Sequence, residues 1–228
     1  MQHSIELAVF DISGTTVKDK GEIIDSFKKT FEQKGILVPD KKIAEVMGYK
    51  KTDAIQRLLE EFAKDKTIIS DDNIAEMHTR FVDAMILYYK TSNELESLPF
   101  AEETFEWLKK NNVKIGLDTG FFSDITNVIV ERLGWLKNGF IDYVISSDEV
   151  PAGRPQPYMI QALMKRADIN DAKKVIKVGD TEVDIREGRS AQCLFTIAVT
   201  TGAYTKKELE LHSPDFIIDS LQQLKELL

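Results

Sequence analysis

Short apolar runs that end in small or polar residues recur along the chain. The first covers residues 5–10, ends at Asp11 and is followed by the polar stretch 13–16. Similar runs cover residues 113–120, 140–149, 173–181 and 194–202. An apolar run bounded by turn-forming residues is typical of a buried strand. The pattern therefore predicts five buried strands, each with polar residues at its carboxyl end.

Amphipathic stretches separate these runs. Residues 102–111, 123–134, 156–167 and 181–191 carry apolar side chains at the three- to four-residue spacing of a helix face. Strands that alternate with helices form a parallel sheet covered on both faces, and ligands bind at the carboxyl ends of its strands. We therefore predict an α/β fold with a doubly wound, Rossmann-like parallel sheet.

Residues 19–91 show a different pattern, with no convincing strand and three amphipathic helices. The third helix is expected to start from a Ser70 cap. We predict a core domain of residues 1–18 and 92–228, with a small helical-bundle cap domain of residues 19–91 inserted after the first strand. Linkers at 18–21 and 91–99 would let the cap act as a hinged lid that excludes water from a site below it.

Composition excludes several classes of function. The 228 residues carry 30 Lys and Arg against 38 Asp and Glu, and the net charge of −8 disfavours a nucleic-acid partner. Cys193 is the single cysteine, so the sequence offers neither an intramolecular disulfide nor a multi-thiolate zinc site. No apolar run approaches the ~18 residues of a membrane span and no signal peptide is visible. We expect a cytoplasmic protein without a membrane partner, and we consider a homodimer.

Familiar catalytic motifs of other enzyme classes are missing from the sequence. The three histidines, His3, His78 and His212, are not spaced as metal ligands. The chain also lacks the GxSxG, HExxH and GxxxxGK[ST] patterns. These observations disfavour serine hydrolases, zinc proteases and P-loop proteins.

Chemistry-bearing residues instead follow the predicted strands. Asp11, Thr119 and Asp180 stand at strand ends, and Arg154 lies in a GRPQP loop. Any one of them alone is a weak signal, because short motifs match by chance, but together they form a set. Asp11 and Asp180 would make an oxygen-rich site that suits Mg²⁺, with Asp184 orienting its neighbours.

The same strand ends could hold a phosphoryl group. Its oxygens would bind the backbone N–H groups around Gly14, Thr15 and Gly120, the Thr119 hydroxyl, and Arg154. With a cation to screen charge, a carboxylate such as Asp11 can attack phosphorus and form an aspartyl-phosphate intermediate.

Four segments resemble the four motifs of the haloacid dehalogenase superfamily, in order and along the whole chain. They are DISGTTV (11–17), LDTGF (117–121), VPAGRPQPYM (150–159) and IKVGDTEVDIREGRSAQ (176–192). The resemblance implies an Mg²⁺-dependent hydrolase with Asp11 as nucleophile. It also implies that Asp11, the Ser13 backbone carbonyl and Asp180 are the metal ligands.

The chain is most similar to the phosphonatase branch of that superfamily. Ser13 stands where most members have a second Asp and phosphonatases have Ala, and Arg154 replaces the usual lysine, as in phosphonatases. The segment MGYKK (47–51) resembles the MGxxK motif of the phosphonatase cap, which places Met47 and Gly48 at the substrate and Lys51 as its lysine.

This resemblance implies cleavage of the C–P bond of phosphonoacetaldehyde or a related 2-oxoalkylphosphonate. Lys51 would convert the aldehyde to an iminium, so that the electrons of the broken bond flow into an enamine while Asp11 attacks phosphorus. Lys51 must be neutral to act, and the positive end of the helix that follows it, together with Lys50, favours that state.

Two positions depart from the phosphonatase pattern. Ala54 stands where phosphonatases have a histidine three residues beyond the lysine, and Phe121 stands where they have a phenol. A polar partner for the imine is therefore missing or moved. These changes fit a related 2-oxoalkylphosphonate or another small phosphorylated metabolite as substrate.

Two other functions stay open at this point. The first is a phosphomonoesterase, similar to a phosphoglycolate phosphatase, which would use Asp11 without a strong acid. The second is a catalytically silent domain that binds metabolites or a partner. The hypothesis of a silent domain does not explain why the whole set is intact, namely Asp11, Thr119, Arg154 and Asp180.

Overall fold

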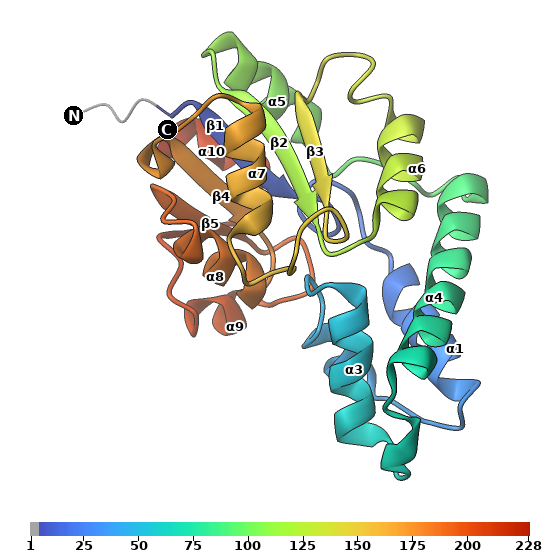
Figure 1. Ribbon diagram of the computed structural model, residues 1–228. Coiled ribbons are helices and arrows are strands. Elements are labelled where there is room, and N and C mark those ends of the chain that lie inside the picture. The colour runs from blue at the N-terminus through green and yellow to red at the C-terminus, as the bar shows by residue number, and fades with distance from the viewer. Residues whose placement is uncertain (1–4) are drawn as a thin grey trace.

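The computed structural model describes residues 5–228; residues 1–4, with His3, lie outside the described part of the chain. Its centre is a six-stranded sheet in the order β3-β2-β1-β4-β5-β6, with every neighbouring pair parallel (Figure 1). This arrangement confirms the predicted α/β class. The strands are β1 (Leu7–Asp11), β2 (Lys114–Thr119), β3 (Tyr143–Ser146), β4 (Val175–Gly179), β5 (Phe195–Val199) and β6 (Phe216–Ile218).

The central strand β1 is buried on both faces, which explains its uninterrupted apolar sequence. Leu7 and Val9 pack into one hydrophobic cluster with α7, whereas Ala8 and Phe10 pack into another with α5. This alternation follows from the two-residue period of a strand. The helices beside the sheet are α5 (Ala101–Lys110), α6 (Ser123–Leu133), α7 (Tyr158–Arg166), α8 (Glu182–Ser190), α9 (Lys206–Glu210) and α10 (Leu224–Leu227).

The sheet and the helices beside it form the body of the molecule. Three elements of this body were not predicted from the sequence. The strand β6 has only three residues, and α9 and α10 are shorter than two helical turns. Elements this short carry too few apolar positions to show a period. The 3-10 turns η2 (Ala172–Lys174) and η3 (Leu221–Gln223) are equally short.

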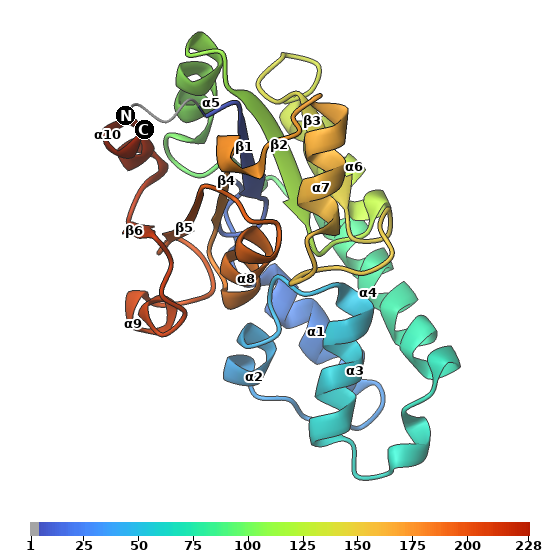
Figure 2. The same cartoon turned by 60° about the vertical axis from the view of Figure 1, so that its left-hand side comes forward.

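Four helices form a separate layer beyond the carboxyl ends of the strands, which we call the cap (Figure 2). Helices α1 and α3 both pack on α4. The Phe27 and Phe81 rings meet at 4.7 Å between centroids, and the Ser70 side chain caps α4 as predicted. The cap comprises α1 (Glu22–Glu32), α2 (Asp40–Ala44), α3 (Lys51–Phe62), η1 (Lys66–Ile68) and α4 (Asp71–Thr91).

The two connections between the cap and the sheet run side by side. Val17 forms an antiparallel bridge with Ser97, and the Leu98 N–H donates to the Thr16 carbonyl at 2.8 Å. The Lys18 side chain also pairs with Glu96 at 3.0 Å. The chain therefore enters and leaves the cap at one place, next to the carboxyl end of β1.

Candidate active site

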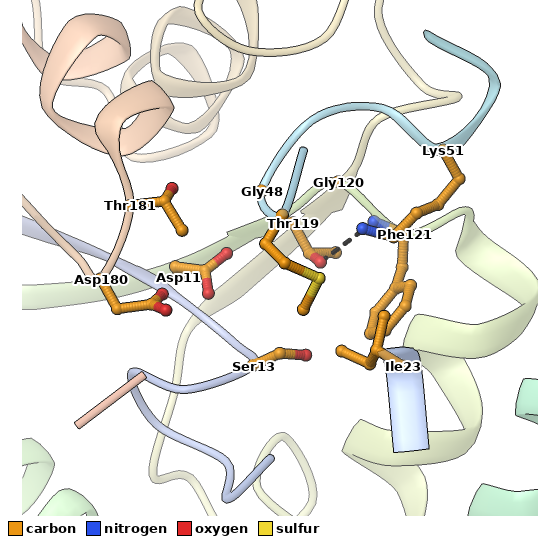
Figure 3. A pocket seen from close by; sticks show the side chains of 11 residues that line it. Asp11, Ser13, Ile23, Gly48, Lys51, Thr119, Gly120, Phe121, Asp180 and Thr181 are labelled. Atoms are coloured by element: carbon orange, nitrogen blue, oxygen red, sulfur yellow. Dashed lines mark hydrogen bonds between the residues drawn. The ribbon is translucent and has the colours of Figure 1, made fainter. Parts of the chain in front are cut away.

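The carboxyl ends of β1, β2 and β4 meet at one small cavity. Asp11 ends β1, Thr119 ends β2, and Asp180 directly follows β4. The cavity leaves about 20 Å³ for the centres of water-sized molecules, so the cap is closed over it. Figure 3 shows residues of the sheet and of the cap facing one another across it. The lining residues are Asp11, Ser13, Ile23, Met47, Gly48, Lys51, Thr119, Gly120, Phe121, Asp180 and Thr181.

Lys51 reaches this cavity from the first residue of α3. Its side chain is buried, and its Nζ lies 5.0 Å from the centre of the Phe121 ring and 5.9 Å from that of Phe27. Within residues 5–228 the Lys51 ammonium donates one hydrogen bond, to the Tyr49 carbonyl at 3.5 Å. An ammonium held mainly against aromatic faces has lost most of its hydration.

Burial lowers the pKa of Lys51 to about 8. The charges of Asp11, Asp19 and Asp180 act in the opposite direction, and the charge of Arg154 adds to the lowering. At neutral pH about one Lys51 in ten is then neutral, compared with roughly one in 2,500 for an ordinary lysine. The side chain is therefore suited to act as a nucleophilic amine.

Arg154 lies behind the cavity wall and does not line it. Its Nη1 donates to Asp11 Oδ1 at 2.6 Å and lies 3.1 Å from Asp184 Oδ1. Its Nε donates to Glu187 Oε2 at 3.0 Å, and its Nη2 donates to the carboxylate and the carbonyl of Asp118. A guanidinium has five N–H donors, and five acceptor contacts surround this one. Arg154 therefore fixes the orientation of Asp11.

Lys177 is a second buried cation in the same cluster. It contacts the Asp118 carboxylate and lies 3.2 Å from both Asp184 and Glu187. Burial acts to lower the pKa of Lys177, but the carboxylates outweigh it and the pKa lies above its usual value. The sequence analysis missed Asp118, Lys177 and Glu187. Asp118 and Lys177 could have been found as charges inside apolar strands, since a buried charge needs a partner, whereas Glu187 lies in the helix α8 and carries no such signal.

Two sets of carboxylates could hold a metal ion. Asp11, Asp118 and Asp184 each place an oxygen within 4.8 Å of the others. However, Arg154 contacts all three and Lys177 contacts two of them, so protein cations already neutralise this set.

Asp180 differs from these carboxylates because no lysine or arginine of residues 5–228 forms an ion pair with it. Its oxygens accept from the Thr15 hydroxyl at 3.1 Å and from the Ala203 N–H at 2.7 Å. Burial and the charge of Asp11 raise the pKa of Asp180 well above its usual value. Asp11 and Asp180 thus form a buried acidic pair that a hard divalent cation would fit.

Three glycines let the cap segment 47–51 lie directly on the body. A Cβ on Gly120 would come within 2.3 Å of the Tyr49 carbonyl oxygen, and one on Gly153 within 2.8 Å of the Lys50 Cβ. A Cβ on Gly48 would meet the Thr181 hydroxyl at 2.6 Å. Real Cβ atoms do not approach this closely, so glycine is required at each contact for this closure.

Eight of the predicted site residues line the cavity, and four lie outside its lining. The Gly14 N–H donates to the Val17 carbonyl at 2.8 Å, and the Thr15 hydroxyl donates to Asp180. Asp184 accepts from Thr181 in a capping box that starts α8. The phosphate-binding roles given to Gly14, Thr15 and Arg154 stay predictions, since their donors face protein acceptors.

His78 of α4 is a neighbour of Lys51 that sequence reasoning did not connect with the site. Its ring lies 4.1 Å from that of Phe122, and its Nε2 is buried without a hydrogen-bond partner. Burial, and then the Lys51 charge, lower the pKa of His78 to about 4, so the imidazole is neutral. Ala54 stands where phosphonatases have a histidine, and it is buried in the cap core.

Comparison with known proteins agrees with this geometry. The family model described as haloacid dehalogenase-like hydrolase matches residues 8–199. A phosphonoacetaldehyde hydrolase from Parabacteroides distasonis is 32% identical over 206 residues, which cover 86% of this chain and 76% of that protein.

Two solved structures share the fold at low sequence identity. A phosphonoacetaldehyde hydrolase-like protein from Oleispira antarctica superposes with a TM-score of 0.85 at 20% identity, covering 98% of this chain and 91% of that one. A putative phosphoglycolate phosphatase from Lactobacillus delbrueckii subsp. bulgaricus gives 0.79 at 20% identity, covering 100% and 98%.

An α/β body with a carboxylate at the end of its central strand and a helical cap above it defines a capped hydrolase. The chain belongs to the haloacid dehalogenase-like hydrolase family, and it is an enzyme that resembles phosphonoacetaldehyde hydrolases. Within residues 5–228 no helix combines the length and the apolar character that crossing a membrane requires.

Proposed function

We propose that the protein is an Mg²⁺-dependent hydrolase that cleaves the C–P bond of phosphonoacetaldehyde or a related 2-oxoalkylphosphonate. The observation that carries this proposal is Lys51, a buried amine with a pKa lowered to about 8 in the same cavity as Asp11. A C–P bond breaks only if carbon can accept the electron pair. An iminium formed by Lys51 provides that acceptor.

In the first step the neutral Lys51 amine attacks the aldehyde carbon, water leaves, and an iminium forms. Asp11 then attacks phosphorus, and the electron pair of the C–P bond moves into the iminium to give an enamine. Protonation of the enamine at carbon and hydrolysis of the imine release acetaldehyde and restore Lys51. Water finally hydrolyses the aspartyl phosphate and restores Asp11.

Asp11, the Ser13 backbone carbonyl and Asp180 would hold the Mg²⁺ ion, which would screen the charge of Asp11 from that of the incoming phosphoryl group. Arg154 keeps the Asp11 carboxylate oriented toward the cavity through their 2.6 Å contact. Thr119 and Gly120 also line the cavity, where they can face the phosphoryl oxygens. The closed cap excludes water while the iminium exists.

Borohydride reduction in the presence of phosphonoacetaldehyde tests the proposal. We expect a stable secondary-amine adduct on Lys51, identified by peptide mass, and loss of turnover in Lys51→Ala. The matched control is Lys50→Ala, because Lys50 faces the Phe122 ring instead of the cavity. Full C–P cleavage by Lys51→Ala would refute the Schiff-base route.

A phosphomonoesterase is the alternative that the same site supports. Below pH 8 Lys51 is largely an ammonium, which would pair with a carboxylate on a substrate such as phosphoglycolate. Lys51→Arg separates the two functions, because arginine keeps the charge and cannot form an imine. Activity on phosphate esters that survives in Lys51→Arg supports the esterase, whereas a protein without any turnover in Mg²⁺ would be a silent binding domain.

A further inference from the structure

Asp180 is oriented by a segment of the body that lies behind the cavity wall. Its Oδ2 accepts from the Ala203 N–H at 2.7 Å. The backbone beside this donor lies directly against the carboxylate, since a Cβ on Gly202 would collide with the same oxygen. Because no lysine or arginine of residues 5–228 forms an ion pair with Asp180, its orientation depends on this N–H and on the Thr15 hydroxyl.

Tyr204, the residue after Ala203, reaches the cap. Its side chain is half-buried, and its hydroxyl donates to the Glu45 carbonyl at 3.3 Å. The helix α2 ends at Glu45, and carbonyls at a helix end lack a partner within the helix. Burial raises the pKa of the Tyr204 phenol above its usual value, so the hydroxyl stays a donor. Two residues after Glu45 the chain enters the cavity wall at Met47.

The contact between Tyr204 and Glu45 crosses an open groove between the cap and the body. The groove has a volume of about 530 Å³, and α2 and α3 of the cap and α8 and α9 of the body contribute to its walls (Figure 2). Side chains do not fill this space, so the hydrogen bond spans a gap that packing leaves open. The bond is long for two oxygens, which suits a contact that breaks each time the cap opens.

Thr201 fixes the other end of this segment to the body. Its hydroxyl donates to the Gly14 carbonyl at 2.7 Å, in the loop that follows β1. Peptide units are planar and of fixed length, so three residues separate the two ends with little slack. A shift of the Tyr204 backbone therefore displaces the Ala203 N–H between them.

We propose that residues 201–204 form a strap that couples closure of the cap to the orientation of Asp180, with Tyr204 as a positioning residue. With the cap closed, Tyr204 holds Glu45 and the Ala203 N–H stays on Asp180. When the cap opens, Tyr204 loses its acceptor and the strap no longer fixes this donor. Such coupling is reciprocal, so a ligand that fixes Asp180 also favours closure. The importance of the strap rests on the proposed function, in which Asp180 is a metal ligand.

Hydrogen–deuterium exchange of the metal-free protein tests the strap. The readout is the exchange rate of the Val46 and Met47 amides, which donate to carbonyls within the cap at 3.1 Å. Tyr204→Phe removes only the hydroxyl, and we expect both amides to exchange about threefold faster, since a neutral hydrogen bond makes a modest net contribution. Asp180→Ala frees the strap from its acceptor and should also make exchange faster.

The decisive measurement is the double variant Tyr204→Phe with Asp180→Ala. If the strap connects the two sites, Asp180→Ala causes no further increase once the Tyr204 hydroxyl is absent. The same increase from Asp180→Ala in both backgrounds, or unchanged exchange in Tyr204→Phe, would overturn the strap.

Two controls separate the strap from a general loss of structure. Tyr158→Phe changes an exposed tyrosine of the body and should keep wild-type exchange. Amides of α4 should exchange at the wild-type rate in Tyr204→Phe, because the cap stays folded. An equal increase in α4 would show a general loosening of the cap and would count against the strap.

A second measurement distinguishes the strap from the proposed function. Mg²⁺ should slow exchange of the Val46 and Met47 amides in the wild type but not in Tyr204→Phe, while it raises the melting temperature of both proteins. Equal protection of the two proteins would overturn the strap. If Mg²⁺ raises neither melting temperature, the metal site of the proposed function is wrong, and the metal-free comparison still decides the strap.

Discussion

The Lys51 ammonium lies 5.0 Å from the centre of the Phe121 ring, with no carboxylate of the described chain in an ion pair with it. Phe121 is buried and belongs to the second sequence motif, whereas Lys51 belongs to the cap. One contact thus joins the second sequence motif to the Lys51 amine. The aromatic face stabilises the ammonium less than water would, which is why the lysine loses its proton so readily.

The first prediction concerns the pH dependence of imine formation. Because the pKa of Lys51 is lowered to about 8, its neutral fraction increases with pH and levels off above 8. The initial rate of borohydride trapping should therefore increase about tenfold per pH unit below that value and then reach a plateau. A rate that keeps increasing to about pH 10 would show an ordinary, solvated lysine.

The second prediction concerns the close contact between the cap segment 47–51 and the body. Gly153→Ala places a Cβ 2.8 Å from the Lys50 Cβ and should hold segment 47–51 away from the body. We expect activity to fall by about 10²-fold, because a displacement near 1 Å misaligns reacting groups. The double variant Gly153→Ala with Lys50→Gly removes the colliding atom and should recover most of the activity. No recovery would show that the loss has another cause.

The third prediction concerns the buried charge cluster. Arg154→Met leaves Asp11, Asp118, Asp184 and Glu187 with Lys177 as their only cation, at a cost of about 3–5 kcal/mol in the free energy of unfolding. Urea denaturation measures this change. The control is Arg80→Ala, which removes an exposed pair with Glu76 and should cost under about 1 kcal/mol. Equal effects of the two substitutions would contradict the structural role of Arg154.

The fourth prediction identifies the metal ligands by stability. If Asp11 and Asp180 hold Mg²⁺, the ion should raise the melting temperature, since a ligand at 100 times its Kd stabilises the fold by about 2.7 kcal/mol. Asp180→Asn should abolish this shift, and a chelator should reverse it in the wild type. A shift that persists in Asp180→Asn would move the ion to the cluster of Asp11, Asp118 and Asp184.

The sheet and the cavity residues at its edge could be predicted because they depend on local pattern. An apolar run ending in a polar residue predicts a strand tip, and parallel strands bring their tips together, as for Asp11 and Asp180. The helix expected directly after Lys51 is present as α3, although it begins at Lys51 itself. The short strand β6 and the helix α2 lacked enough residues to show a period.

The buried partners could not be predicted, because they depend on how distant elements pack. Glu22 and Tyr89 are 67 residues apart and meet only when α1 lies against α4. Arg154 showed a similar limit, since its sequence context suggested a phosphate contact while its donors face carboxylates from three other elements. Hydrophobic pattern predicts which face is buried, but it does not pair the polar groups on that face.

The connections that meet at Val17 and Ser97 allow the inserted helices to change during evolution without a change in the strands. Because the chain leaves and re-enters the sheet at neighbouring points, an inserted segment of another length or shape can replace the helices there without altering any strand. Under the proposed function, the phosphorus chemistry would stay with the sheet, while new leaving groups would be acquired by exchanging the insertion. A common ancestor could in this way give rise to descendants that share a nucleophile and differ in what they release.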